Sequence, residues 1–119
     1  MKDTAERYDF TIPLYEIRVS VYISHDMAYN IIDINNDFGI TVEKGKFQAK
    51  AMQIGNSNEV RFAILLQEHN DLVKVIAHES LHLSWYICGA LGIELSLNNH
   101  EPQAYILEYI VDKINSFLI

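Results

Sequence analysis

The chain has 119 residues, a formal net charge of -7 and a hydrophobic content of 50%. This apolar fraction is enough to build a core, so the composition excludes a chain that is disordered throughout. An acidic chain without a basic patch has no electrostatic reason to bind DNA or RNA, and we expect no nucleic-acid partner. The single cysteine, Cys88, excludes internal disulfides and a cysteine-rich zinc finger.

The sequence shows no targeting or membrane-spanning pattern. The polar residues 1–6 lack the apolar segment of a signal peptide, and no run of about 18 apolar residues occurs. No repeat, low-complexity tract or linker divides the chain. We therefore expect one cytoplasmic domain over residues 1–119 that does not associate with membranes, and nothing in the sequence sets its oligomeric state.

The first forty residues predict one strand and one short helix. Residues 1–10 are polar and aperiodic, which indicates a loose lead-in. From residue 11 to residue 24, apolar and polar side chains alternate, as is typical of a long half-buried strand. Ser24 is a suitable N-cap for a helix that ends near Gly39.

The rest of the chain predicts a hairpin followed by two helices. Residues 47–54 and 59–66 have strand patterns and flank a turn-forming Gly-Asn-Ser-Asn segment. Helical patterns follow over residues 72–91 and, after a proline suited to a first helical position, over residues 102–117. The order predicts an α+β domain with a small antiparallel or mixed sheet backed by helices. The candidate caps of the first of these two helices are Asn70 or Asp71 and Gly92.

The helix over residues 72–91 carries the sequence His78-Glu79-Ser80-Leu81-His82, which matches H-E-x-x-H. His78 and His82 are one helical turn apart on one face, so both imidazoles can reach one tetrahedral Zn²⁺. Glu79 flanks that face, where its carboxylate can act as a general base on a water molecule. The alternative is an accidental match, in which these residues are ordinary surface or core side chains.

A catalytic zinc site also needs a third protein ligand. Glu94, His100, Glu101 and Glu108 are the candidates downstream. We favour Glu101, because it directly precedes Pro102 at the start of a helix, where Ser, Thr, Asp or Asn would be the better cap. His100 and Glu108 remain as alternatives.

These two helices resemble the zincin metallopeptidases of the gluzincin type. In that family, H-E-x-x-H is followed after some twenty residues by a glutamate ligand on the next helix, and here the eighteen residues 83–100 separate His82 from Glu101. The stretches 72–82 and 98–105 also resemble small zincin-like proteins of bacteria, bacteriophages and prophages. Over the preceding residues the similarity is only architectural.

The resemblance implies a minimal zincin-like fold with one Zn²⁺ per chain. His78, His82 and Glu101 would be the metal ligands, and Glu79 would be the catalytic base. By analogy, the strand over residues 59–66 would form the edge of the sheet beside the cleft, where an extended peptide could add as a further strand.

This chain departs from full gluzincins after the third ligand. Those enzymes continue into a helical domain that walls the cleft and donates a Tyr or His to the transition state. Only eighteen residues follow Glu101, so we expect no such domain and an open site. The available donors are Tyr86, His100 and Tyr105; we favour Tyr105, although packing between helices is its simpler role.

The sequence thus predicts a zinc-dependent metallopeptidase acting on a peptide or protein substrate, with Glu79 as the general base and Tyr105 as a second catalytic residue. The alternative is a non-catalytic zinc-binding or degenerate zincin domain that serves as a protein-interaction module. The intact Glu79 favours catalysis, and the expected lack of a second domain favours the interaction module. No sequence feature names a particular substrate.

Overall fold

The computed structural model describes residues 4–43, 45, 47–56, 59–69 and 71–118. Within these ranges the chain forms an α+β arrangement of four strands and three helices, in agreement with the expected fold class. In chain order the elements are β1 (Glu6–Ile12), β2 (Ile17–Ser24), α1 (Met27–Phe38), β3 (Ala49–Asn56), β4 (Glu59–Gln67), α2 (Leu72–Leu91) and α3 (Glu101–Phe117).

The four strands form one mixed sheet in the order β1-β2-β4-β3. β2 pairs with β1 in antiparallel and with β4 in parallel orientation, and β3 pairs with β4 in antiparallel orientation. The prediction that the strand over residues 59–66 forms the sheet edge was therefore wrong, since β3 is the edge strand on that side. β4 runs apolar from Phe62 to Leu66 with every side chain buried, which is typical of an interior strand covered on both faces.

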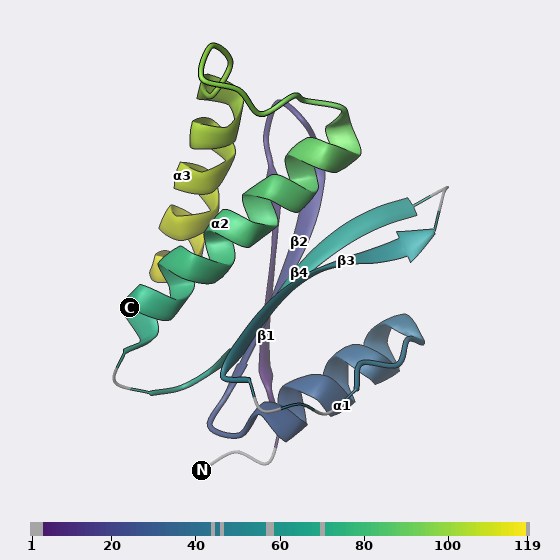
Figure 1. Ribbon diagram of the computed structural model, residues 1–119. Coiled ribbons are helices and arrows are strands. Elements are labelled where there is room, and N and C mark those ends of the chain that lie inside the picture. The colour runs from purple at the N-terminus through teal and green to yellow at the C-terminus, as the bar shows by residue number, and fades with distance from the viewer. Residues whose placement is uncertain (1–3, 44, 46, 57–58, 70, 119) are drawn as a thin grey trace.

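Helices cover both faces of the sheet, with α1 on one side and α2 and α3 on the other (Figure 1). Alternate residues of β4 contribute to the two cores, because successive side chains of a strand point to opposite faces. The larger core joins α2 and α3 to the sheet and includes Phe10, Val19, Phe62, Ile64, Leu83, Ile87, Ile106 and Ile110. The smaller core joins α1 to the sheet and consists of Tyr22, Met27, Ile31, Ile34, Ile54, Ala63 and Leu65.

The predicted long strand over residues 11–24 is two strands, and the predicted loose lead-in contains most of the first. β1 and β2 pair around a four-residue turn, with Ile12 opposite Ile17. Within the turn, Leu14 and Glu16 have positive φ angles of 74° and 53°. These are left-handed conformations that non-glycine residues seldom adopt. Because the turn contains no glycine or asparagine, its sequence does not predict a hairpin turn.

The cap of α1 also differs from the prediction. Asp26, and not Ser24, is the N-cap, since its side chain accepts a hydrogen bond from the Ala28 N–H at 3.0 Å. Ser24 supports the same turn by donating its hydroxyl hydrogen to the Asp26 carbonyl oxygen at 2.6 Å. Gly39 ends the helix in the left-handed region with φ 62°, as its position predicted.

The hairpin and the two long helices are confirmed. β3 and β4 pair in antiparallel register on either side of the predicted turn, of which residues 57–58 lie outside the described residues. α2 spans the predicted residues and ends at Gly92, while Asp71 stands at its N-cap without a side-chain cap bond and Asn70 lies outside the described residues. Among the helices that the structure describes, none is long and apolar enough to cross a membrane.

Candidate metal centre

The H-E-x-x-H segment lies in the middle of α2, on the helix face turned away from the larger core. The opposite stripe of α2, with Ile76, Leu83 and Ile87, is fully buried against the sheet and α3. His78 is 68% exposed and His82 is half-buried. The helix is therefore anchored by one stripe and presents both imidazoles on the other, as its periodicity predicts.

The two imidazoles point their Nε2 atoms at each other. These atoms lie 3.1 Å apart, and the ring centroids are 4.7 Å apart with the planes steeply inclined. Two nitrogens bound to one tetrahedral Zn²⁺ at about 2.0–2.1 Å would lie about 3.3 Å from each other. The spacing of this pair therefore fits two ligand positions of a single metal ion. Trp85 closes one side of the pair, with its ring 5.7 Å from that of His82.

Glu79 turns from the same segment toward the edge of the sheet. Its Oε1 accepts a hydrogen bond from the backbone N–H of Ala51 in β3 at 3.0 Å, and its Oε2 lies 3.9 Å from Nε2 of His78. Only 15% of the Glu79 side chain is exposed. The carboxylate is thus fixed beside the histidine pair by a main-chain donor, a contact that leaves no signal in the sequence of β3.

A hollow of about 260 Å³ adjoins this segment between the first half of α2 and the start of β3. Its walls are formed by Gln48, Ala49, Lys74, Val75, His78 and Glu79. The sequence did not point to this hollow, because Gln48 and Ala49, which line it at the start of β3, carry no reactive group.

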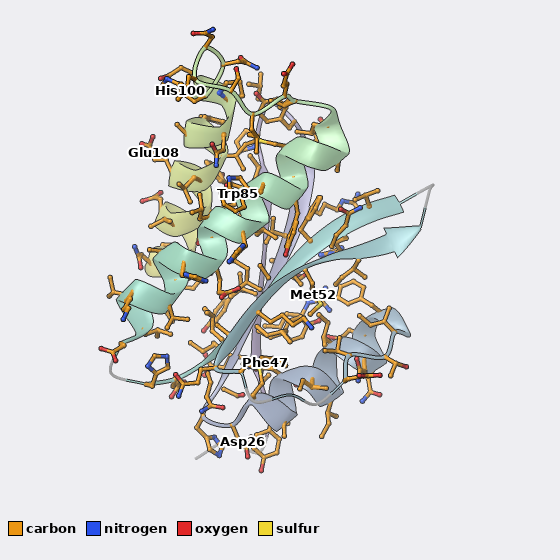
Figure 2. All side chains as sticks on the ribbon, in the orientation of Figure 1. Asp26, Phe47, Met52, Trp85, His100 and Glu108 are labelled. Atoms are coloured by element: carbon orange, nitrogen blue, oxygen red, sulfur yellow. The ribbon has the colours of Figure 1, made fainter. Side chains whose placement is uncertain are left out.

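The structure does not bring a third ligand to the histidine pair. Among the described residues, no group of three or more His, Cys, Asp or Glu side chains is placed to hold a metal ion. Glu101 begins α3 with a side chain that is 90% exposed and lies 3.8 Å from His100. His100 lies at the top of α3 and Glu108 projects from the side of α3 that faces away from α2 (Figure 2). The donor set present thus fits two ligand positions and leaves the third open.

Tyr105 of α3 packs against the turn between β1 and β2. Its hydroxyl is 3.5 Å from the Pro13 carbonyl oxygen, and its ring packs 6.3 Å from the rings of both Tyr15 and Tyr109. These contacts match the packing role considered for this residue and do not place it beside the histidine pair.

Two other histidines and the cysteine, which are metal-binding residue types, lie elsewhere. The ring of His25 lies 5.3 Å from that of Tyr29 in a tilted arrangement near the start of α1, on the opposite face of the sheet. Nδ1 of His69 accepts a hydrogen bond from the Asp71 N–H at 3.0 Å, just before α2. Cys88 is fully buried, and its burial raises the pKa of the thiol, as is typical of a small core residue.

Comparisons with protein-family models, curated proteins and solved structures find no match to this chain.

Proposed function

We propose that this chain is a zinc-dependent metallopeptidase, in which His78, His82 and Glu101 bind the metal and Glu79 is the general base. The observation that carries the proposal is the 3.1 Å separation of the two Nε2 atoms, with the Glu79 carboxylate fixed next to them. A carboxylate next to two metal-binding imidazoles is the arrangement that a metal-activated water reaction needs.

Zinc bound at this pair would supply a Lewis acid that polarises a peptide carbonyl and lowers the pKa of a water molecule. In this proposal, Glu79 transfers the protons of the reaction. The Ala51 N–H engages Oε1, while Oε2 faces His78 and is left to take a proton from the attacking water and pass it to the leaving amine.

The edge strand β3 supports an extended peptide as the substrate. Residues of an antiparallel strand turn their N–H and C=O groups alternately toward and away from the partner strand. The Ala51 N–H points away from β4, since it donates to Glu79, so the main-chain groups of Ala49 and Gln53 face the same way. Because Glu79 already takes the Ala51 N–H, a peptide that adds along β3 would pair with Ala49 or Gln53, on either side of Glu79.

The proposal requires the side chain of the third ligand, Glu101, to move. The Glu101 carboxylate lies 3.8 Å from His100, and both side chains are largely exposed. Turning this carboxylate toward the histidine pair therefore breaks no buried interaction. His100 and Glu108 remain the alternatives, and the oxyanion role of Tyr105 would likewise need this residue to leave its contacts with Pro13 and Tyr15.

The second candidate function is a zinc-binding interaction module without catalysis. The observation in its favour is the absence of a third ligand beside His78 and His82 among the described residues. A two-histidine site could bind zinc weakly or share it with a partner protein, and Glu79 would then serve only to hold β3.

Cleavage of a peptide library by the zinc-loaded protein tests the proposal. We expect cleavage by the wild type and a loss of about 10²- to 10⁴-fold in the Glu79→Gln variant, the usual contribution of a general base. Glutamine keeps an oxygen that can accept from the Ala51 N–H, so the variant should fold and bind zinc as the wild type does. Asp112→Asn, which removes an exposed carboxylate of α3 that is not a candidate ligand, is the matched control.

Cleavage that survives in Glu79→Gln would contradict the role of Glu79. Zinc binding by the wild type with no cleavage of any library peptide would favour the interaction module.

A further inference from the structure

The hollow beside the histidine pair carries one positive charge that no described residue neutralises. Lys74 lies on α2 one turn before His78, is exposed, and lines the hollow together with Gln48 and with Ala49 of β3. Within the part of the chain that the structure describes, no ion pair or hydrogen bond of its ammonium group is found. In a chain of net charge -7, with sixteen acidic side chains, an unpaired lysine at this place is notable.

The size of the hollow suits one side chain. Its volume of about 260 Å³ is below the range of about 300–1,000 Å³ typical of pockets that enclose a whole small-molecule ligand. Ala49 and Val75 form apolar walls, and Lys74 adds a cation at the rim. An aliphatic stem that ends in a carboxylate matches both features, since the stem contacts the apolar walls and the carboxylate meets the ammonium group.

Glu79 fixes the orientation of such a side chain. It lines the same hollow and carries a negative charge, so a second carboxylate is repelled from its end and attracted to the Lys74 end. Glutamate reaches further than aspartate by one methylene, and its two methylenes contact more of the apolar walls.

We infer that Lys74 is a specificity-determining residue that selects substrates with a glutamate next to the scissile bond, whose side chain enters the hollow between α2 and the start of β3. This inference rests on the proposed peptidase function and names the substrate class of that same site. Lys74 contacts the substrate side chain only, so its replacement changes which peptides are cleaved without removing the catalytic carboxylate.

Sequencing of the peptides cleaved from a mixed library by the zinc-loaded full chain tests this inference. For the wild type we expect glutamate to be enriched at one position flanking the cleaved bond. A synthetic peptide with glutamate there should be cleaved about 5-fold more efficiently, by kcat/KM, than its glutamine counterpart, the upper range for an exposed ion pair. Lys74→Gln should abolish the preference, and Lys74→Glu should reverse it.

Lys113→Gln is the matched control, because it removes the same charge from α3. Lys113 lies over the ring of Tyr109, which packs against Phe10 of β1 at the opposite edge of the sheet. This variant should keep the full preference for glutamate.

The outcomes separate the inference from the function on which it rests. Cleavage without glutamate enrichment, or a preference that Lys74→Gln leaves unchanged, would overturn the role of Lys74 and leave the peptidase function intact. An absence of cleavage by the zinc-loaded wild type would overturn both.

Discussion

The charged groups on the two faces of the sheet differ in whether they are paired. On the α1 face, Arg7 contacts Asp9 and Asp37 at 3.0 Å each, and the hydroxyl of the buried Tyr22 donates to Asp37 at 2.6 Å. Arg61 completes this cluster by contacting Asp9 at 3.4 Å. On the α2 face, His78 and Lys74 are exposed and His82 is half-buried, and the described residues place no counter-ion on Lys74.

From this difference we infer a structural role for the polar groups on the α1 face and a binding role for those on the α2 face. The α1-face cluster satisfies its members internally, and the two guanidinium groups also lie over the ring of Phe38 at 5.0 and 5.2 Å. Such a network ties α1 to the sheet and leaves little for a ligand to bind. The α2 face holds polar groups that converge without neutralising each other, which is the pattern expected of a binding site.

The largest effect should be the loss of zinc affinity when the proposed third ligand, Glu101, is replaced. Glu101→Ala should weaken zinc binding by at least about 100-fold. Replacing a residue that only hydrogen-bonds to a metal ligand already lowers metal affinity by about 10- to 100-fold, and the loss of a ligand itself should be larger. Competition with a chelator of known affinity measures this change. Glu108→Ala and His100→Ala are the controls, and an unchanged affinity in Glu101→Ala with a loss in either control would transfer the ligand role to that residue.

On the α1 face, Asp37→Ala should affect stability and not metal binding. The substitution leaves the Tyr22 hydroxyl and one Arg7 contact without a partner, so we expect the free energy of unfolding to fall by about 1–3 kcal/mol. Urea denaturation measures this fall, with Asp112→Ala on the exposed side of α3 as the control. A loss of zinc affinity in Asp37→Ala would show that the two faces are coupled.

A smaller, pH-dependent effect should come from Asp9. Burial alone would raise the pKa of its carboxyl group, but hydrogen bonds from Ser20 and Arg7 and the charges of Arg7 and Arg61 outweigh burial and lower it. A carboxyl group whose pKa is lower in the folded chain stabilises the fold above its ordinary pKa of 3.8. That contribution is lost as the pH falls below 3.8 through the folded value.

The free energy of unfolding of the wild type should therefore fall more steeply below this pH than that of Asp9→Asn. Urea titrations at a series of acidic pH values measure both slopes. Equal slopes would show that the Asp9 cluster does not favour the charged carboxylate.

The sequence predicted those elements whose local pattern agrees with their tertiary position. α2 and the β3–β4 hairpin have a clear period and recognisable ends, and both were predicted within a few residues. β1 was missed although Tyr8, Phe10 and Ile12 alternate as strongly as the residues of β2. The apolar residues of β1 have even numbers, while those that alternate along β2 have odd numbers. The alternation therefore shifts by one residue between the two strands, and this shift marks the turn. Leu14 and Glu16 form that turn in unusual conformations.

The candidate site was predictable only where it lies on one helix. His78, Glu79 and His82 follow from helical spacing, and the structure brings the three together. The position of Glu101 depends on how α3 packs, which the sequence does not fix. The Ala51 N–H and the hollow beside Lys74 involve main-chain groups and small side chains of β3, which have no recognisable motif.

The zinc content of the purified chain, measured by elemental analysis, tests the central claim most directly. The wild type should hold about one zinc per chain, and His82→Ala should lose it. His25→Ala, which removes an imidazole from the opposite face of the sheet, should keep it. A wild-type chain that retains no zinc, and takes up none when zinc is supplied, would contradict the account and leave His78, Glu79 and His82 as ordinary helix-surface residues.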